Sequence, residues 1–305
     1  MTPRHLSSIL DLSPGELGDL LDAALAIKRD GCGPVLAGQS LALVFEKPSL
    51  RTRVSFEVAM QRLGGRAIYL GPQEIGPGER EPVRDIARVL GRMVHGIAAR
   101  TYAHDTVLEF SEWAGVPVIN ALSDHEHPCQ ALADLLTLRE RFSTLRGLRI
   151  AYLGEGNNVA RALAHASVLA GMELRCASPE GYALSDADVE FAHAAAGGGR
   201  VERFTDPAEA VRDVAAVYTD VWASMGDEDK LASRLETFEP FRLDEALLEA
   251  APPDALVMHD MPAHRGQEIS EGAMESPRSV ILDQAENRLH AQQALLAWLL
   301  GGAAG

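Results

Sequence analysis

Short apolar runs alternate with amphipathic stretches along most of the chain. Residues 41–45 form a uniformly apolar run, which predicts a buried strand that ends before Pro48. Apolar residues then recur at roughly helical spacing as far as Gly64, so we expect a helix that begins after Ser49. The same strand-then-helix order repeats down the chain, which is typical of parallel α/β sheets.

The apolar runs fall into two series, and the pattern resets around residues 143–147. Strands are predicted at residues 41–45, 66–70, 96–101, 116–120, 149–153, 173–177, 201–204, 215–219, 256–259 and 279–282. We therefore predict two doubly wound parallel-sheet α/β domains joined by helices. Their limits are placed at residues 1–138 and 139–284, and residues 285–305 are expected to form a C-terminal helix that packs back on the first domain.

The formal net charge of the chain limits the kinds of molecule that it is expected to bind. The 305 residues carry a formal net charge of −16, which argues against general nucleic-acid binding because that needs a broad basic surface. An anionic substrate would have to be attracted by local positive charge. The candidate cations are Arg51, Arg53, Arg100 and Arg288.

Cysteine usage and apolar segments indicate the compartment. The three cysteines have no spacing typical of a disulfide framework, which favours a reducing cytoplasmic setting. The first residues lack the apolar region of a signal peptide, and no apolar run approaches the length of a membrane span. We expect a soluble cytoplasmic protein that does not bind membranes.

The start of the helix after the first strand is a candidate phosphate site. Its first turn holds Ser49, Arg51, Thr52 and Arg53, so hydroxyl groups, guanidinium groups and backbone N–H groups converge there. The alternative is a capped helix with two solvated arginines. Arg100 also follows a strand, and because ligands of parallel sheets lie beyond the strands' carboxyl ends, Arg51 and Arg100 are expected to face one crevice.

Two motifs raise the question of a cofactor or a metal. Gly154 and Gly156 follow a strand as in a dinucleotide fingerprint, but Val159 occupies the last glycine position, so asparagines presented to a small polar ligand fit better than a nicotinamide cofactor. His127 and Cys129 offer metal-ligand atoms, but no second Cys/His cluster completes a tetrahedral site. We expect neither a metal nor a cofactor.

His127 and Gln130 are three residues apart, so on a first helical turn both side chains would reach one ligand. As an alternative, they serve only to cap the helix. Asp220 and Asp260 each follow a predicted strand, where a carboxylate suits an amine or amino-acid ligand; as loop residues they would only cap the backbone. Arg288 in the last helix either points inward near a strand end or forms an ordinary surface pair with Glu286.

Taken together and in order, these segments resemble the aspartate/ornithine carbamoyltransferase family across essentially the whole chain. The ornithine branch is favoured by Phe45-Glu46-Lys47, by Cys129 and by the residues after the strand at 215–219, and the start of the last helix agrees with it. The segments that carry the resemblance are Ser49-Leu50-Arg51-Thr52-Arg53, Arg100-Thr101, His127-Pro128-Cys129-Gln130, Asn157-Asn158, Asp220-Val221-Trp222, Ser224-Met225-Gly226 and Asp283-Gln284-Ala285-Glu286-Asn287-Arg288.

The resemblance implies a first domain that binds carbamoyl phosphate and a second that binds ornithine. It implies that the phosphate is held by Ser49, Leu50 through its backbone, Arg51 and Thr52. The carbamoyl group would be held by Arg100, His127 and Gln130, with help from Arg288 and the backbone of Met261. The amino-acid end of ornithine would be held by Asn158, Asp220, Ser224 and Met225.

The resemblance further implies transfer of the carbamoyl group to the side-chain amine of L-ornithine, giving L-citrulline for arginine biosynthesis. The family fold closes two domains on the substrates, usually in a homotrimer or a multiple of trimers with sites between subunits. The expected catalytic side chains are Arg100, His127 and Asp260. Fixed donors would stabilise the developing oxyanion, and no covalent intermediate is required.

Two segments depart from the family pattern. The ornithine branch normally has His-Cys-Leu-Pro where this chain has His259-Asp260-Met261-Pro262, and Gly76 stands where a glutamine near the phosphate is expected. We hypothesise that Asp260 orients and deprotonates the acceptor amine. The alternatives are a different diamino acid or an acylated ornithine as the acceptor, or a non-catalytic relative that only binds the ligands.

Overall fold

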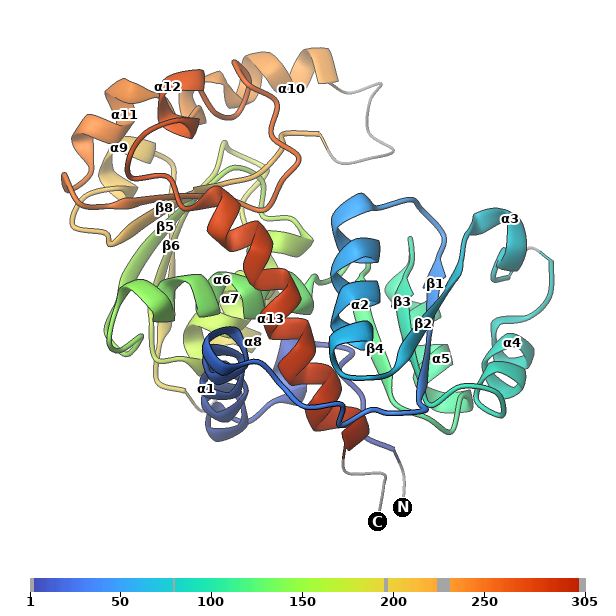
Figure 1. Cartoon of the computed structure of the whole chain (residues 1–305). Helices are drawn as coiled ribbons and strands as arrows, with labels where there is room; N and C mark the ends of the chain where they lie inside the picture. Colours follow the sequence, from blue (N-terminus) through green and yellow to red (C-terminus); the bar gives the residue numbers. More distant parts are fainter. Residues whose placement is uncertain (1–2, 79, 195–196, 224–230, 302–305) are drawn as a thin grey trace. The chain divides into compact units, whose positions relative to one another are not determined.

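The computed structural model describes residues 3–78, 80–194, 197–223 and 231–301. The chain divides into two compact units (Figure 1). Unit 1 comprises Met1–Leu136 together with Glu286–Gly305, and unit 2 comprises Thr137–Ala285. A parallel sheet organises each unit, so the predicted α/β class is confirmed.

Unit 1 holds a four-stranded sheet in the order β2-β1-β3-β4, and all three neighbouring pairs are parallel. Its strands are β1 (Ser40–Phe45), β2 (Arg66–Leu70), β3 (Gly96–Arg100) and β4 (Val118–Leu122). Its helices are η1 (Ile9–Asp11), α1 (Pro14–Asp30), α2 (Leu50–Arg62), α3 (Pro72–Ile75), α4 (Val83–Leu90) and α5 (His104–Trp113), with parts of α6 (Pro128–Arg141) and α13 (Ile281–Leu300).

Every residue of β1 is buried because helices cover both faces of the sheet. On one face Ala42 and Val44 pack in a cluster with Ile86 of α4 and Phe110 of α5 (Figure 1). The hydrogen bonds that join helix α13 to the rest of this unit include those from Lys28 to Asn287 (2.8 Å) and from the Gln39 side chain to the carbonyl of Leu300 (3.3 Å).

Unit 2 holds a five-stranded parallel sheet in the order β7-β6-β5-β8-β9. Its strands are β5 (Arg149–Leu153), β6 (Glu173–Ala177), β7 (Arg200–Phe204), β8 (Ala216–Thr219) and β9 (Leu256–His259). Its helices are α7 (Asn158–Leu169), α8 (Asp186–Ala194), α9 (Pro207–Ala210), α10 (Leu231–Phe238), η3 (Glu239–Phe241), α11 (Glu245–Ala250) and α12 (Glu271–Met274).

The strand order reverses once in each sheet, between β1 and β3 in unit 1 and between β5 and β8 in unit 2. In open parallel sheets the helices on either side of such a point leave opposite faces of the sheet. A crevice for ligands therefore opens beyond the carboxyl ends of these strands. This edge is where the polar residues singled out in the sequence fall.

Local predictions were confirmed at two helix starts, because Ser13 caps α1 in a capping box and Ser49 caps α2. The strand predicted at residues 279–282 was wrong. Ser279 makes only an isolated bridge to Val257, and the chain enters α13 at Ile281, four residues before the predicted start at residue 285. A short apolar run fits a strand and the buried side of a helix start equally well, so its periodicity could not decide.

Helix α13 has 20 residues. Within the described part of the chain, neither this helix nor any other combines the length and apolar character that spanning a bilayer requires.

Candidate functional site

The start of α2 in unit 1 presents hydroxyl and backbone groups at the carboxyl end of β1. The Ser49 hydroxyl accepts the N–H of Thr52 (3.4 Å) and donates to the Thr52 hydroxyl (3.0 Å). Leu50, at the first helical position, is 74% exposed, so only its backbone can serve the site. Arg51 lies partly exposed in the same turn. Such a helix start binds anions through its backbone N–H groups and its positive dipole end.

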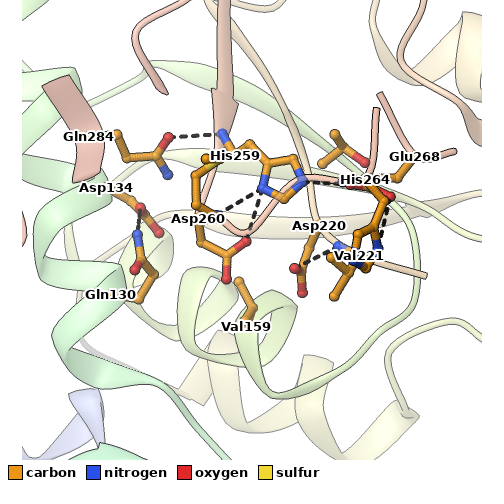
Figure 2. A network of polar contacts seen from close by, with 12 residues as sticks. Gln130, Asp134, Val159, Asp220, Val221, His259, Asp260, His264, Glu268 and Gln284 are labelled. Atoms are coloured by element: carbon orange, nitrogen blue, oxygen red, sulfur yellow. Dashed lines mark hydrogen bonds and ion pairs between the residues drawn. The ribbon is translucent and has the colours of Figure 1, made fainter. Parts of the chain in front are cut away.

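Arg288 of α13 is buried and joins three helices of unit 1. Its guanidinium group donates to the Thr52 hydroxyl and to the side-chain oxygen of Gln130, both at 2.9 Å. Gln130 in turn donates to Asp134 at 2.8 Å (Figure 2). The structure thus brings together Thr52, Gln130 and Arg288, which are far apart in the sequence, and one rigid planar cation fixes the two side chains.

Arg100 and His127 are two further buried polar residues at this edge. Arg100 is the last residue of β3, and the carbonyl of His127 accepts the N–H of Gln130 (3.0 Å) at the start of α6. Burial, and then the positive charges of Arg288, Arg100 and Lys47, hold the pKa of His127 well below its ordinary value. The ring is therefore neutral at pH 7. Its Nδ1 has no hydrogen-bond partner among the residues that the structure describes.

One cation singled out in the sequence lies elsewhere. The Arg53 side chain is 47% exposed, pairs with Glu57 at 2.9 Å and stacks over the Tyr69 ring, 4.0 Å from its centroid. Successive helical positions point in different directions, so Arg51 and Arg53 do not share a face. The expectation that Arg53 contributes to the cation cluster was wrong.

In unit 2 the first polar group beyond β8 is Asp220, which is only 6% exposed. Its carboxyl group accepts hydrogen bonds from the Asn157 side chain (2.8 Å) and from the Val221 N–H (2.7 Å; Figure 2). Asn157 also caps α7, whereas Asn158 is the first residue of that helix and partly exposed. The sequence pointed to Asn158, but Asn157 is the residue that contacts Asp220. Its place as the N-cap after a glycine turn was the available signal.

His259, the last residue of β9, was not singled out as a site residue in the sequence, although it lies at the centre of this cluster. The ring is fully buried, and its Nε2 lies 3.1 Å from a carboxylate oxygen of the buried Glu268 (Figure 2). Its Nδ1 accepts the N–H of Met261 (2.9 Å) and lies 3.5 Å from Asp260. Burial lowers the pKa of His259, but the neighbouring carboxylates of Asp260 and Glu268 favour the protonated ring and raise it to about 9. In the geometry of the structure Nδ1 accepts the Met261 N–H, so the ring proton lies on Nε2 and faces Glu268.

Asp260 and Met261 form the turn that follows β9. The Asp260 side chain is 12% exposed and faces His259 and Asp220. Met261 has a φ of 63°, a left-handed conformation that non-glycine residues adopt rarely and that is concentrated at functional turns. Ser224 and Met225, which the sequence singled out together with Asp220, lie outside the described residues.

Two clusters have the residue types that metals bind. In unit 2, ligand atoms of Asp220, His259 and Asp260 lie within 4.8 Å of one another. In unit 1, Cys129 follows His127, but its S–H donates to the carbonyl of Asn120 (3.5 Å). Burial raises the pKa of the Cys129 thiol to about 12. A thiol held protonated in this way is not a metal ligand, since metals bind the thiolate.

Family models match both units. The model described as "Aspartate/ornithine carbamoyltransferase, carbamoyl-P binding domain" matches residues 4–140, and the model for the "Asp/Orn binding domain" matches residues 146–299. The chain belongs to the aspartate/ornithine carbamoyltransferase family. Thr52 and Gln130 lie in the part matched by the carbamoyl-phosphate model, whereas Arg288, Asp220 and Asp260 lie in the part matched by the amino-acid model.

Individual carbamoyltransferases are similar over their full length. The ornithine carbamoyltransferase of Methanoculleus marisnigri is 51% identical over 299 residues, covering 97% of this chain and 96% of the relative. The anabolic ornithine carbamoyltransferase of Pyrococcus furiosus is 48% identical, with 98% and 97% covered. A solved structure of ornithine carbamoyltransferase from Pyrococcus furiosus superposes with a TM-score of 0.94 at 45% identity, covering 99% of this chain and 98% of that one.

The neutral state of His127 predicts a pH-dependent stability. In the unfolded chain its pKa returns to about 6.5. Below about pH 6.5 His127 binds a proton in the unfolded state but not in the folded state, so the folded state loses stability as the pH falls. Between pH 6.5 and 5 we expect the free energy of unfolding to fall by up to about 1.4 kcal/mol per pH unit more in the wild type than in His127→Gln.

Urea unfolding at pH 7.5 and pH 5 measures this difference. His264→Gln, at a half-exposed histidine of unit 2, is the matched control and should keep the wild-type slope. Equal slopes for the wild type and His127→Gln would contradict a neutral buried His127.

Proposed function

We propose that this protein is an ornithine carbamoyltransferase, which transfers the carbamoyl group of carbamoyl phosphate to the side-chain amine of L-ornithine and releases L-citrulline and phosphate. The observation that carries the proposal is the division of charge. At the candidate site of unit 1 the largely buried charged side chains include the cations Arg100 and Arg288, and at the candidate site of unit 2 they include the carboxyl groups of Asp220 and Asp260. The relatives at about half identity bear the same enzyme name.

Carbamoyl phosphate would be held at the start of α2 and around Arg288. We assign the phosphate to Ser49, the Leu50 backbone, Arg51 and Thr52. The carbamoyl group is assigned to Arg100, His127, Gln130, Arg288 and the Met261 backbone. A neutral His127 donates one N–H to the carbamoyl oxygen, and Arg100 adds positive charge as that oxygen becomes negative in the transition state.

L-Ornithine would be held in unit 2. We assign its amino-acid end to Asn158, Asp220, Ser224 and Met225. The side-chain amine must be neutral to attack, yet an alkyl ammonium with a pKa of about 10.4 keeps its proton at pH 7. Asp260 orients this ammonium group and accepts its proton as the new C–N bond forms. Positioning both substrates supplies the rest of the acceleration, so the reaction needs neither a metal nor a cofactor.

The remaining assignments follow the family resemblance. We propose a carbamoyl-phosphate-binding domain at residues 1–138, an ornithine-binding domain at 139–284 and a C-terminal helix at 285–305. We also propose a cytoplasmic enzyme of arginine biosynthesis, as the word "anabolic" in the Pyrococcus furiosus relative's name suggests, that binds neither nucleic acid nor membranes. A homotrimer or a multiple of trimers would cover Leu50 and Val54, which expose apolar side chains one turn apart on α2. This assembly is tested by light scattering, which measures the molar mass in solution.

The activity is tested by citrulline formation. With carbamoyl phosphate and L-ornithine we expect citrulline and phosphate in equal amounts. A panel of other acceptors, including lysine, 2,4-diaminobutyrate and N-acetylornithine, should give a kcat/KM at least tenfold lower. Preference for another acceptor would show that Asp260 changes the specificity, and binding without any transfer would contradict an enzyme.

Arg288 provides a test of the carbamoyl-phosphate site. Arg288→Lys removes the rigid fork that donates to both Thr52 and Gln130. Losing hydrogen bonds to a charged group costs about 1.5–3 kcal/mol, so the KM for carbamoyl phosphate should rise about 10- to 100-fold. Steady-state kinetics measure it. Arg53→Lys, at the exposed arginine of α2, should stay within about twofold of wild type. An unchanged KM in Arg288→Lys would exclude the assigned role.

Asp260 provides a test of the base. Asp260→Asn keeps the size of the side chain but cannot accept a proton, so kcat with ornithine should fall about 10²- to 10⁴-fold. Asp260→Cys restores the residue of the family pattern and an ionisable group, and it should recover part of that loss. Both rates come from the citrulline assay. Wild-type turnover by Asp260→Asn would rule out the base.

A further inference from the structure

Asp220 and Asp260 lie side by side at one edge of the unit 2 sheet. Strands β8 and β9 are parallel neighbours whose last residues, Thr219 and His259, are paired in register. The next residue of each strand therefore falls at the same level, about 4.8 Å from its neighbour. Oxygen atoms of the two carboxyl groups lie within 4.8 Å of each other.

Two neighbouring carboxyl groups can share a hydrogen bond only when one of them is protonated, because an ionised carboxylate only accepts. Both groups are also shielded from water, with Asp220 6% exposed and the Asp260 side chain 12% exposed. Two like charges so close in a buried site cannot both persist, and one of the pair stays protonated. Burial and the charge of Asp260 accordingly raise the pKa of Asp220 well above its ordinary value.

The groups that face the pair do not neutralise it fully. Within the described part of unit 2, neither carboxyl group contacts a lysine or an arginine. Arg234, a nearby cation, is held by Glu155. The other titratable groups around the pair are Tyr152, whose hydroxyl donates to the Asn157 side chain, and His259, whose Nε2 lies 3.1 Å from the carboxylate of Glu268. Among the described residues of unit 2, no lysine or arginine supplies a further positive charge, so the pair has room for a proton.

A metal ion fits the same three side chains less well. A metal needs a lone pair on His259, but Nδ1 accepts the N–H of Met261 (2.9 Å) and Nε2 lies 3.1 Å from Glu268. Coordination would break one of these contacts in a fully buried site, and an unsatisfied buried polar group is costly. A proton between the two carboxyl groups leaves both contacts of the His259 ring nitrogens intact.

We propose that Asp220 and Asp260 act as one unit that holds a single proton in the free protein and releases it when the side-chain ammonium group of the acceptor binds. The inference rests on the proposed function, since it concerns the acceptor amine. In the free site the pair carries one proton and a net charge of −1. The bound ammonium replaces that proton, which leaves to solvent, and the pair becomes fully ionised.

Release of this proton leaves Asp260 ionised, so that it can act as the base in the transfer step. Once the pair is ionised, Asp260 accepts one proton from the ammonium nitrogen. The neutral amine then forms its bond to the carbamoyl carbon as the bond to the phosphate oxygen breaks, and the second proton that the nitrogen loses passes to the leaving phosphate. The pair ends the cycle with one proton, as it began. This assigns Asp220 an acid–base role with Asp260 in addition to binding, and it selects an acceptor whose side chain ends in an amine.

The shared proton is tested first in the protein without substrates. Infrared difference spectra at pH 7 should show the C=O stretch of a protonated carboxyl group in the wild type that is absent from both Asp260→Asn and Asp220→Asn. Asp254→Asn, which removes an exposed carboxylate from the same unit, should keep the band. A wild type without the band, or a band that persists in Asp260→Asn, would overturn the proposal.

The release step is tested by calorimetry. L-Ornithine is titrated in two buffers of different ionisation enthalpy, with saturating phosphonoacetamide, an analogue of carbamoyl phosphate whose carbon bridge prevents turnover. The wild type should release about one proton per ornithine, whereas L-norvaline, which lacks the side-chain amine, should release almost none. Asp260→Asn should bind ornithine with almost no release.

The possible outcomes distinguish a failure of the shared-proton proposal from a failure of the proposed enzyme activity. One proton released by Asp260→Asn would show that the amine itself loses it, which contradicts the pair. A protein that shows the infrared band but makes no citrulline would contradict the proposed function and still support the shared proton. Loss of the infrared band when Mg²⁺ or Zn²⁺ is added at low concentration would favour a metal in its place and overturn the proposal.

Discussion

The parallel pairing of adjacent strands is the constraint on which both halves of the chemistry depend. Parallel strands all end at one edge of their sheet, so residues that are far apart in sequence meet there. In unit 2 the pairing of Thr219 with His259 places Asp220 beside Asp260. In unit 1 the pairing of Phe45 with Arg100 places a buried cation beside the loop that leads into α2. The covering helices then only have to add Thr52, Gln130 and Arg288 to an edge already defined by the strands.

The two candidate sites bring together like charges, Arg100 with Arg288 in unit 1 and Asp220 with Asp260 in unit 2, and this is physically costly while the substrates are absent. A buried charge without an opposite partner loses its hydration and gains little in return. Unit 1 limits the cost by keeping His127 neutral among the cations, and unit 2 limits it by placing a proton on its carboxyl pair. Substrates of the opposite charge relieve both situations, so the stored electrostatic cost becomes binding free energy. The formal net charge of −16 gives no hint of this local separation.

The sequence predicted the parts of the site that local rules determine. A cap after a strand located Ser49, and strand ends located Arg100, Asp220 and Asp260. It did not predict the partners that tertiary structure supplies. Asn157 meets Asp220 across 63 residues, and Glu268 reaches His259 through an irregular loop with no periodic signal. The opposite directions of Arg51 and Arg53 were also invisible, because a motif gives residue types but not which way each side chain points.

The same reasoning explains how an aspartate can stand where the family pattern has a cysteine. A thiol with a pKa of about 8.5 is mostly neutral at pH 7, so a cysteine beside Asp220 would give the site a net charge of −1. Two carboxyl groups that share one proton also carry −1. The free site thus has the same charge with either residue, and Asn157 and the Val221 N–H stabilise Asp220 equally in both cases. The difference appears only when an amine binds. A carboxyl pair then loses its proton far more readily than a thiol, so Asp260 offers a second full negative charge where a cysteine would remain largely neutral.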